Sequence, residues 1–178
     1  MTDEITRMLS AAPERPAVPP AKSRLRASIA IALLLVYVAV VLVMTMSPTP
    51  LDRGYESSID KVLGVLHRNG VPEWFGYSKL EFTANIAMFV PLGFLVGLAL
   101  PQRIAWLGLL LLPAFSGVIE MTQSLMLAER FATIEDVIAN SAGGWIGLLI
   151  AFSIRAMVHA RDQKVIARAE WELRHRRW

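Results

Sequence analysis

Cysteine is absent from the 178-residue chain, and histidine occurs only three times. The lack of cysteine excludes disulfide bonds, thiol catalysis and thiolate metal sites. No HxxxH or HExxH spacing is present, so we expect neither a metal site nor another cofactor, although Glu120, Asp136 and His67 are ligand types that could bind a divalent ion. Chemistry or binding by this chain must therefore depend on carboxylates, amides, hydroxyls and basic side chains.

Charged residues are also scarce, at 19% of the chain, whereas hydrophobic residues make up 54%. This composition is too apolar for an ordinary soluble domain of this length. Four windows are long enough to cross a bilayer, which requires roughly 20 apolar residues in a helix. They are residues 28–46, 82–100, 104–123 and about 135–154. The sequence therefore predicts an all-α membrane protein with four transmembrane helices. We interpret the first as a retained anchor, because its apolar run is too long for a signal peptide and no small-x-small cleavage site follows it.

The two ends of the chain differ in composition from the middle. Residues 1–27 are rich in proline and lack apolar periodicity, which predicts a disordered tail. Residues 28–158 form the predicted four-helix membrane domain. Residues 159–178 mix basic and apolar side chains, as is typical of an amphipathic helix attracted to an anionic inner leaflet.

Most of the 18 lysines and arginines lie in the two tails and in the turn at 101–103. The positive-inside rule then places both termini in the cytoplasm. This topology also explains the high isoelectric point, so we expect no nucleic acid partner.

The loop at 47–81 is longer than a connection requires, which is typical of a loop with structure or function of its own. Ile59, Val62, Leu63 and Leu66 recur at helical spacing in this loop and predict a short amphipathic helix on the outer surface. Asp60 and His67 share its other face. They point either towards a pocket formed by the spans or simply into water, which is the more common arrangement.

Small and polar residues share one stripe of each of the last three spans. GxxxG pairs, which permit close helix packing, occur at Gly93 and Gly97 and again at Gly143 and Gly147. Because a lipid-facing surface should be apolar, these stripes are predicted to face one another.

The polar side chains on these stripes fall at similar depths. At about 1.5 Å per residue, Asn85, Glu120 and Asn140 lie roughly 23–27 Å from the cytoplasmic ends of their helices, within a hydrocarbon core of about 30 Å. Gln123 and Asp136 lie about one turn further out, and Arg130 falls in the connecting loop. A charge near hydrocarbon costs free energy unless it is paired or solvated, so charged residues there usually belong to a functional site. The sequence therefore predicts one polar pocket that opens outwards.

Three motifs together resemble the VanZ-like family of small bacterial membrane proteins. They are Asp60-Lys61, the run NIAMFVPLGF beginning at Asn85, and IExxQ at 119–123 followed by Arg130, Asp136, Asn140 and Gly143. The resemblance covers roughly residues 59–150. It implies a helical domain in the bacterial cytoplasmic membrane and, for the family's namesake, reduced sensitivity to the glycopeptide teicoplanin. The family often has a histidine closer to its Asp-Lys pair than His67 is here.

Three hypotheses follow for the polar residues. In the first, the pocket binds a membrane lipid headgroup, a lipid-linked peptidoglycan precursor or an envelope partner. Arg130 would contact a phosphate or carboxylate, and the amides of Asn85 and Asn140 would contribute hydrogen bonds. Glu120 or Asp136 would contact an amine. In the second, the protein is a membrane-embedded transferase or hydrolase in which Glu120 carries a proton and Asp136 is the ionised partner of Arg130. In the third, the same groups form a lattice that only holds the helices together. The sequence leaves open whether the protein is an enzyme, and it does not specify the oligomeric state.

Overall fold

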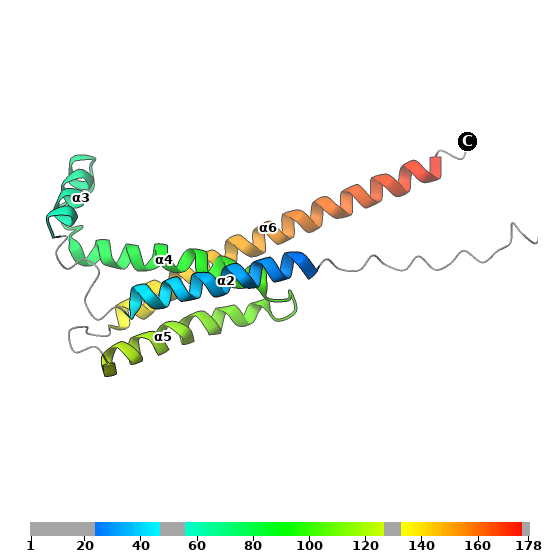
Figure 1. The fold of residues 1–178 in the computed structure, drawn as a ribbon. Coiled ribbons are helices and arrows are strands. Elements are labelled where there is room, and N and C mark those ends of the chain that lie inside the picture. Colours follow the sequence, from blue (N-terminus) through cyan, green and yellow to red (C-terminus); the bar gives the residue numbers. More distant parts are fainter. Residues whose placement is uncertain (1–23, 47–55, 127–132, 176–178) are drawn as a thin grey trace, which may run out of the picture.

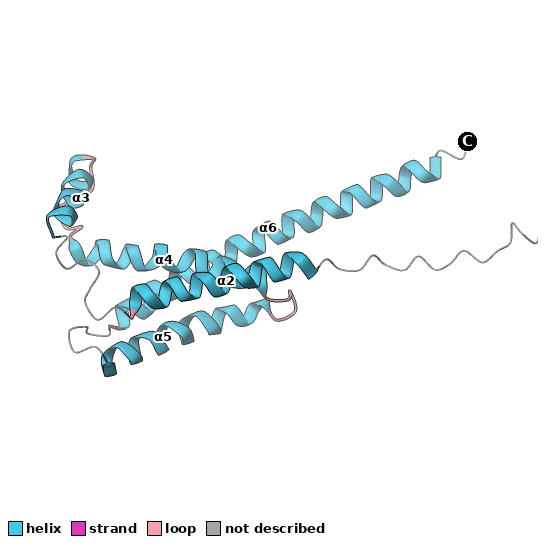
Figure 2. Ribbon diagram, viewed as in Figure 1, coloured by secondary structure: helices cyan, strands magenta, loops and turns pink. Residues whose placement is uncertain are grey.

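The computed structural model describes residues 24–46, 56–126 and 133–175, and all regular elements in these ranges are helical (Figures 1 and 2). The elements are α2 (Arg24–Thr45), α3 (Glu56–Arg68), α4 (Tyr77–Ala99), the 3₁₀ turn η1 (Ala105–Leu107), α5 (Gly108–Met126) and α6 (Ile134–His175). Within the described part of the chain, α2, α4, α5 and α6 are long and apolar enough to cross a membrane. The prediction of four spanning helices is thus confirmed, whereas most of the predicted disordered tail lies outside the described residues.

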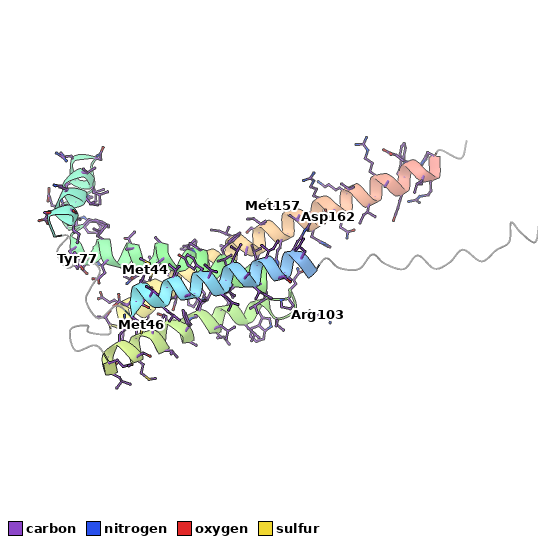
Figure 3. All side chains as sticks on the ribbon, viewed as in Figure 1. Met44, Met46, Tyr77, Arg103, Met157 and Asp162 are labelled. Carbon is purple, nitrogen blue, oxygen red and sulfur yellow. The ribbon has the colours of Figure 1, made fainter. Side chains whose placement is uncertain are left out.

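The four long helices lie side by side, and consecutive helices run in opposite directions (Figure 1). At one end of the bundle, α2 and α5 end and α4 and α6 begin; Met46 and Tyr77 lie here, and Arg103 marks the opposite end (Figure 3). We call the first of these the polar end. It is the end that the sequence predicts to face outwards.

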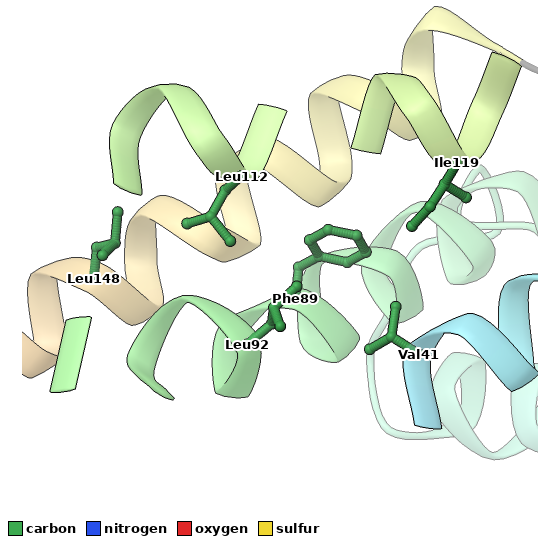
Figure 4. Packing of buried hydrophobic residues seen from close by; sticks show 6 residues of the cluster. All are labelled: Val41, Phe89, Leu92, Leu112, Ile119 and Leu148. Carbon is green, nitrogen blue, oxygen red and sulfur yellow. The ribbon is translucent and has the colours of Figure 1, made fainter. Parts of the chain in front are cut away.

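The outer faces of the bundle are covered by large apolar side chains. Val43 is 73% exposed and Leu149 is 66% exposed, and similar side chains lie on the outward faces of α2, α5 and α6. Such a surface would be unfavourable in water but matches hydrocarbon. The interior contains a smaller cluster of Val41, Phe89, Leu92, Leu112, Ile119 and Leu148 (Figure 4).

Glycine determines how closely α4 and α6 approach each other. A Cβ atom on Gly143 would overlap the carbonyl oxygen of Ile86, and one on Gly147 would overlap that of Val90. On α4, a Cβ on Gly93 would overlap the carbonyl oxygen of Gly144, and one on Gly97 would lie 2.6 Å from the Ala151 Cβ. The close packing predicted from the two GxxxG pairs is therefore confirmed, and both pairs belong to the same interface.

At the end opposite the polar end, Arg155 links α6 to the last turn of α4. Its Nη1 and Nη2 atoms each donate a 3.0 Å hydrogen bond, to the carbonyl oxygens of Leu100 and Leu98 respectively. The final carbonyls of a helix have no partner within the helix, so a guanidinium satisfies them well. The sequence did not predict this contact.

Helix α6 continues far beyond the predicted fourth span. Its 42 residues correspond to about 63 Å of helix, roughly twice the hydrocarbon thickness. No glycine or proline follows Gly147 within the helix, so nothing in the sequence ends it near residue 159, where a separate tail was expected. The last part of α6 therefore extends from the bundle as the same continuous helix, and Met157 and Asp162 lie where it diverges (Figures 1 and 3).

The predicted helix in the long loop is present as α3, at the polar end (Figure 1). It ends at Arg68 and is followed by Gly70, whose φ of 94° is a conformation that favours glycine. The Val71 amide then donates to the Leu66 carbonyl at 3.1 Å, and the Gly70 amide donates to the His67 carbonyl at 3.1 Å. This pair of bonds is a Schellman cap, which explains why the helix stops here. Its location on the outer membrane surface stays a prediction.

Candidate functional site

Asp136 joins α4 to the start of α6 at the polar end. Its Oδ1 atom accepts a 2.7 Å hydrogen bond from Asn85 Nδ2, and its Oδ2 atom accepts one of 2.7 Å from the Thr133 hydroxyl. The Thr133 oxygen in turn accepts from the Asp136 amide at 3.1 Å. Thr133 and Asp136 thus form a reciprocal cap at the beginning of α6, where a carboxylate is also favoured by the helix dipole.

One turn further along α6, Asn140 joins that helix to α5. Its Nδ2 atom donates a 3.0 Å hydrogen bond to the Ser116 hydroxyl oxygen, and both residues are buried. The carbonyl end of the same amide is buried as well, and Oδ1 has no hydrogen-bond partner among the described residues. A buried amide oxygen without a partner is rare, since its desolvation costs free energy that nothing offsets.

Gln123 joins α5 to the end of α2. Its Nε2 atom donates a 2.8 Å hydrogen bond to the Thr45 carbonyl oxygen, and the contact is buried. Because the last carbonyls of a helix have no partner within the helix, this bond satisfies one of them. Gln123 therefore fixes the position of α2 against α5 at the polar end.

Glu120 lies on the buried face of α5, one turn from Ser116 and one turn from Gln123. Only 8% of it is exposed. The bond between Ser116 and Asn140 places these two residues opposite each other. Since α5 and α6 run in opposite directions, one turn towards the polar end brings Glu120 on α5 to the level of Asp136 on α6.

The structure thus gathers five of the residues predicted from the sequence at the polar end. We call Asn85, Glu120, Gln123, Asp136 and Asn140 the polar cluster. The pairing within it differs from the predicted levels by about one turn. The sequence put Asn85, Glu120 and Asn140 at similar depths. In the structure Asn85 instead bonds Asp136, one turn from Asn140, and Asn140 bonds Ser116, one turn from Glu120.

The other predicted residues are not part of this cluster. Arg130 lies outside the described residues. Asp60 and Lys61 are exposed on α3, which stands apart from the four-helix bundle (Figure 1). His67 contacts the loop that leads to α4: its Nε2 atom donates to the Phe75 carbonyl at 3.0 Å, and the Glu73 carboxylate lies 3.3 Å from its Nδ1 atom.

Sequence reasoning missed three contributors to this region: Thr133, the Tyr37 hydroxyl and the Thr45 carbonyl. Thr133 was detectable, because threonine followed three residues later by a carboxylate is the pattern of a capping box. Tyr37 donates a 2.9 Å hydrogen bond to the Met88 carbonyl and Gln123 binds the Thr45 carbonyl, but a main-chain acceptor leaves no trace in the residue pattern. Helix pairing alone reveals such contacts.

The fold and the polar cluster together define the class of this protein. Four membrane-spanning helices with apolar outer faces and a buried polar cluster at one end make this chain a multi-pass α-helical membrane protein. The family model described as VanZ/LLP1 matches residues 31–155, and the chain belongs to this VanZ-like family. A search of curated proteins and a search of solved structures each found no match.

Proposed function

We propose that this protein is a binding protein of the bacterial cytoplasmic membrane, whose outward-facing polar end recognises the headgroup of an envelope lipid or a lipid-linked peptidoglycan precursor. The observation that carries the proposal is the buried Asn140 amide, 3% exposed, whose oxygen has no partner among the described residues. Asp136 lies one turn away on the same helix, and Glu120 lies on α5 one turn from Ser116, the residue that Asn140 bonds. A lattice built only for packing would be expected to satisfy such a group.

The bonds around Asp136 favour binding over acid and base catalysis. Each oxygen of the carboxylate already accepts a hydrogen bond, from Asn85 or Thr133, and the residue also caps α6. These bonds occupy both carboxylate oxygens and hold the group in one orientation, which suits a fixed acceptor better than a general acid or base. An effect on glycopeptide sensitivity would follow if the bound headgroup belonged to the precursor that such antibiotics recognise.

Retention of a headgroup lipid tests the proposal directly. We expect the full-length protein, purified in mild detergent from bacterial membranes, to retain a specific lipid or precursor detectable by native mass spectrometry. Asn140→Ala should reduce the retained fraction about tenfold, because the site loses a desolvated amide. Ser124→Ala, an exposed change on the same helix as Glu120, is the matched control and should retain it fully.

Thermal unfolding of the same samples distinguishes binding from packing. Asn140→Ala protein that has lost its lipid but unfolds close to the temperature of the delipidated wild type supports the proposal. Equal retention in the wild type and this variant, or no retained lipid in either, would contradict it.

The absence of cysteine permits a clean test of the proposed orientation. Ser57→Cys on α3 and Ala160→Cys near the middle of α6 each introduce a single thiol at an exposed position. A membrane-impermeant maleimide should label Ser57→Cys in intact cells or spheroplasts, and should label Ala160→Cys only after the membrane is opened. The reverse pattern would place the polar end in the cytoplasm and overturn the orientation.

A further inference from the structure

The amide nitrogens of the polar cluster are already engaged within the protein. Asn85 donates to Asp136, Gln123 donates to the Thr45 carbonyl, and Asn140 donates to Ser116. A carboxylate and a main-chain carbonyl accept hydrogen bonds but cannot donate them, so the orientations of the Asn85 and Gln123 amides are fixed by chemistry. Each of these bonds uses one N–H of its amide, whereas the Asn140 oxygen, an acceptor, has no partner among the described residues.

Acceptor groups of the polar cluster lie on α5 and α6. The Asn140 Oδ1 atom is buried there without a partner among the described residues, one turn from the Asp136 carboxylate. Glu120 adds a second carboxylate at the level of Asp136 on the facing helix. Two carboxylates and an amide oxygen in a poorly solvated interface repel phosphate and attract a positively charged donor.

We infer that the polar cluster binds a primary ammonium group, as carried by an ethanolamine headgroup lipid, with Asn140 Oδ1, Glu120 and Asp136 as acceptors. This inference rests on the proposed function and specifies its ligand. An ammonium group has three N–H donors, which matches three acceptors contributed by two helices.

The N-methyl series of ethanolamine lipids provides a graded test. Phosphatidylethanolamine, its monomethyl and dimethyl derivatives and phosphatidylcholine keep the positive charge but carry three, two, one and no N–H donors. The full-length protein in nanodiscs is titrated with each lipid, with phosphatidylglycerol as the anionic lipid and soluble ethanolamine as the headgroup without a membrane anchor. Binding is measured by native mass spectrometry of the released complexes.

We expect affinity to fall stepwise along the series, by about tenfold or more from phosphatidylethanolamine to phosphatidylcholine. Glu120→Gln should lower phosphatidylethanolamine binding by about tenfold, since it removes the charge but keeps the shape of the side chain. Glu135→Gln, an exposed carboxylate in the first turn of α6, should leave it unchanged. If soluble ethanolamine competes with the lipid, the ammonium group alone is sufficient for recognition. If only the whole lipid binds, recognition also requires the phosphate or the acyl chains.

Equal affinity for phosphatidylethanolamine and phosphatidylcholine would overturn the inference. So would a preference for phosphatidylglycerol, although selective retention of that lipid would leave the proposed function intact. Binding of Ca²⁺ or Mg²⁺ that Glu120→Gln abolishes would also overturn it in favour of a metal. If Glu120→Gln fails to fold, the methyl series on the wild-type protein still decides, because it requires no substitution.

Discussion

Gly147→Ala is expected to destabilise the protein by about 2–3 kcal/mol, the cost of forcing atoms into a fully packed interface. The added methyl group would overlap the Val90 carbonyl oxygen and would meet the Phe94 amide nitrogen 2.5 Å away. Both are main-chain atoms of α4, so relief requires the two helices to separate. Equilibrium unfolding in mixed detergent micelles, followed by tryptophan fluorescence and circular dichroism, measures the change.

Gly117→Ala is the matched control for this prediction. Gly117 also lies within a spanning helix, but a Cβ at that position meets no atom within 4 Å. Because alanine favours helix over glycine, the control should be neutral or more stable by up to about 1 kcal/mol. Equal destabilisation by the two substitutions would show that helix propensity or insertion, and not the α4–α6 contact, determines stability.

Asp136→Ala is expected to cost about 2 kcal/mol of stability. The change removes the acceptor for Asn85, leaving a half-buried amide nitrogen without its partner, and it removes half of the cap at the start of α6. Glu135→Ala removes a neighbouring carboxylate from the same helical turn, but Glu135 is exposed. Its effect should stay below about 0.5 kcal/mol.

The comparison between these two variants separates specific bonding from the general attraction of a helix N-terminus for negative charge. Both lose one charge in the first turn of α6, so a dipole effect alone would give similar losses. A double-mutant cycle of Asn85→Ala with Asp136→Ala then isolates the contact between α4 and α6. Additive losses in this cycle would contradict the hydrogen bond as a source of stability.

The polar cluster has two separable roles. The bonds from Asn85, Gln123 and Asn140 connect neighbouring helices, and interhelical hydrogen bonds in membranes contribute only about 0.6 kcal/mol on average. Such modest bonds explain helix alignment but not a buried acceptor without a partner. We therefore propose that acceptor groups near Asn140 recognise the ligand. The amide donors of Asn85, Gln123 and Asn140 join the helices.

The sequence by itself determined the number of spanning helices, the faces that pack and the residues that gather at the polar end. These follow from local rules: an apolar window of sufficient length must form a helix in a membrane, and polar or small residues must avoid lipid. The two GxxxG pairs, Gly93 with Gly97 and Gly143 with Gly147, were also recognisable in the sequence, because close helix approach requires small residues at fixed spacing.

Only the tertiary structure decided which groups bond to which. The depth of a residue along its own helix is known from the sequence to about one turn, whereas a hydrogen bond requires the offset between two helices to be known within a fraction of an ångström. The offset between α4 and α6, fixed where Gly143 meets Ile86 and Gly147 meets Val90, pairs Asn85 with Asp136. Asn140 is paired with Ser116 by the offset between α5 and α6. It also leaves the Asn140 oxygen without a partner among the described residues, a feature that no residue pattern could reveal.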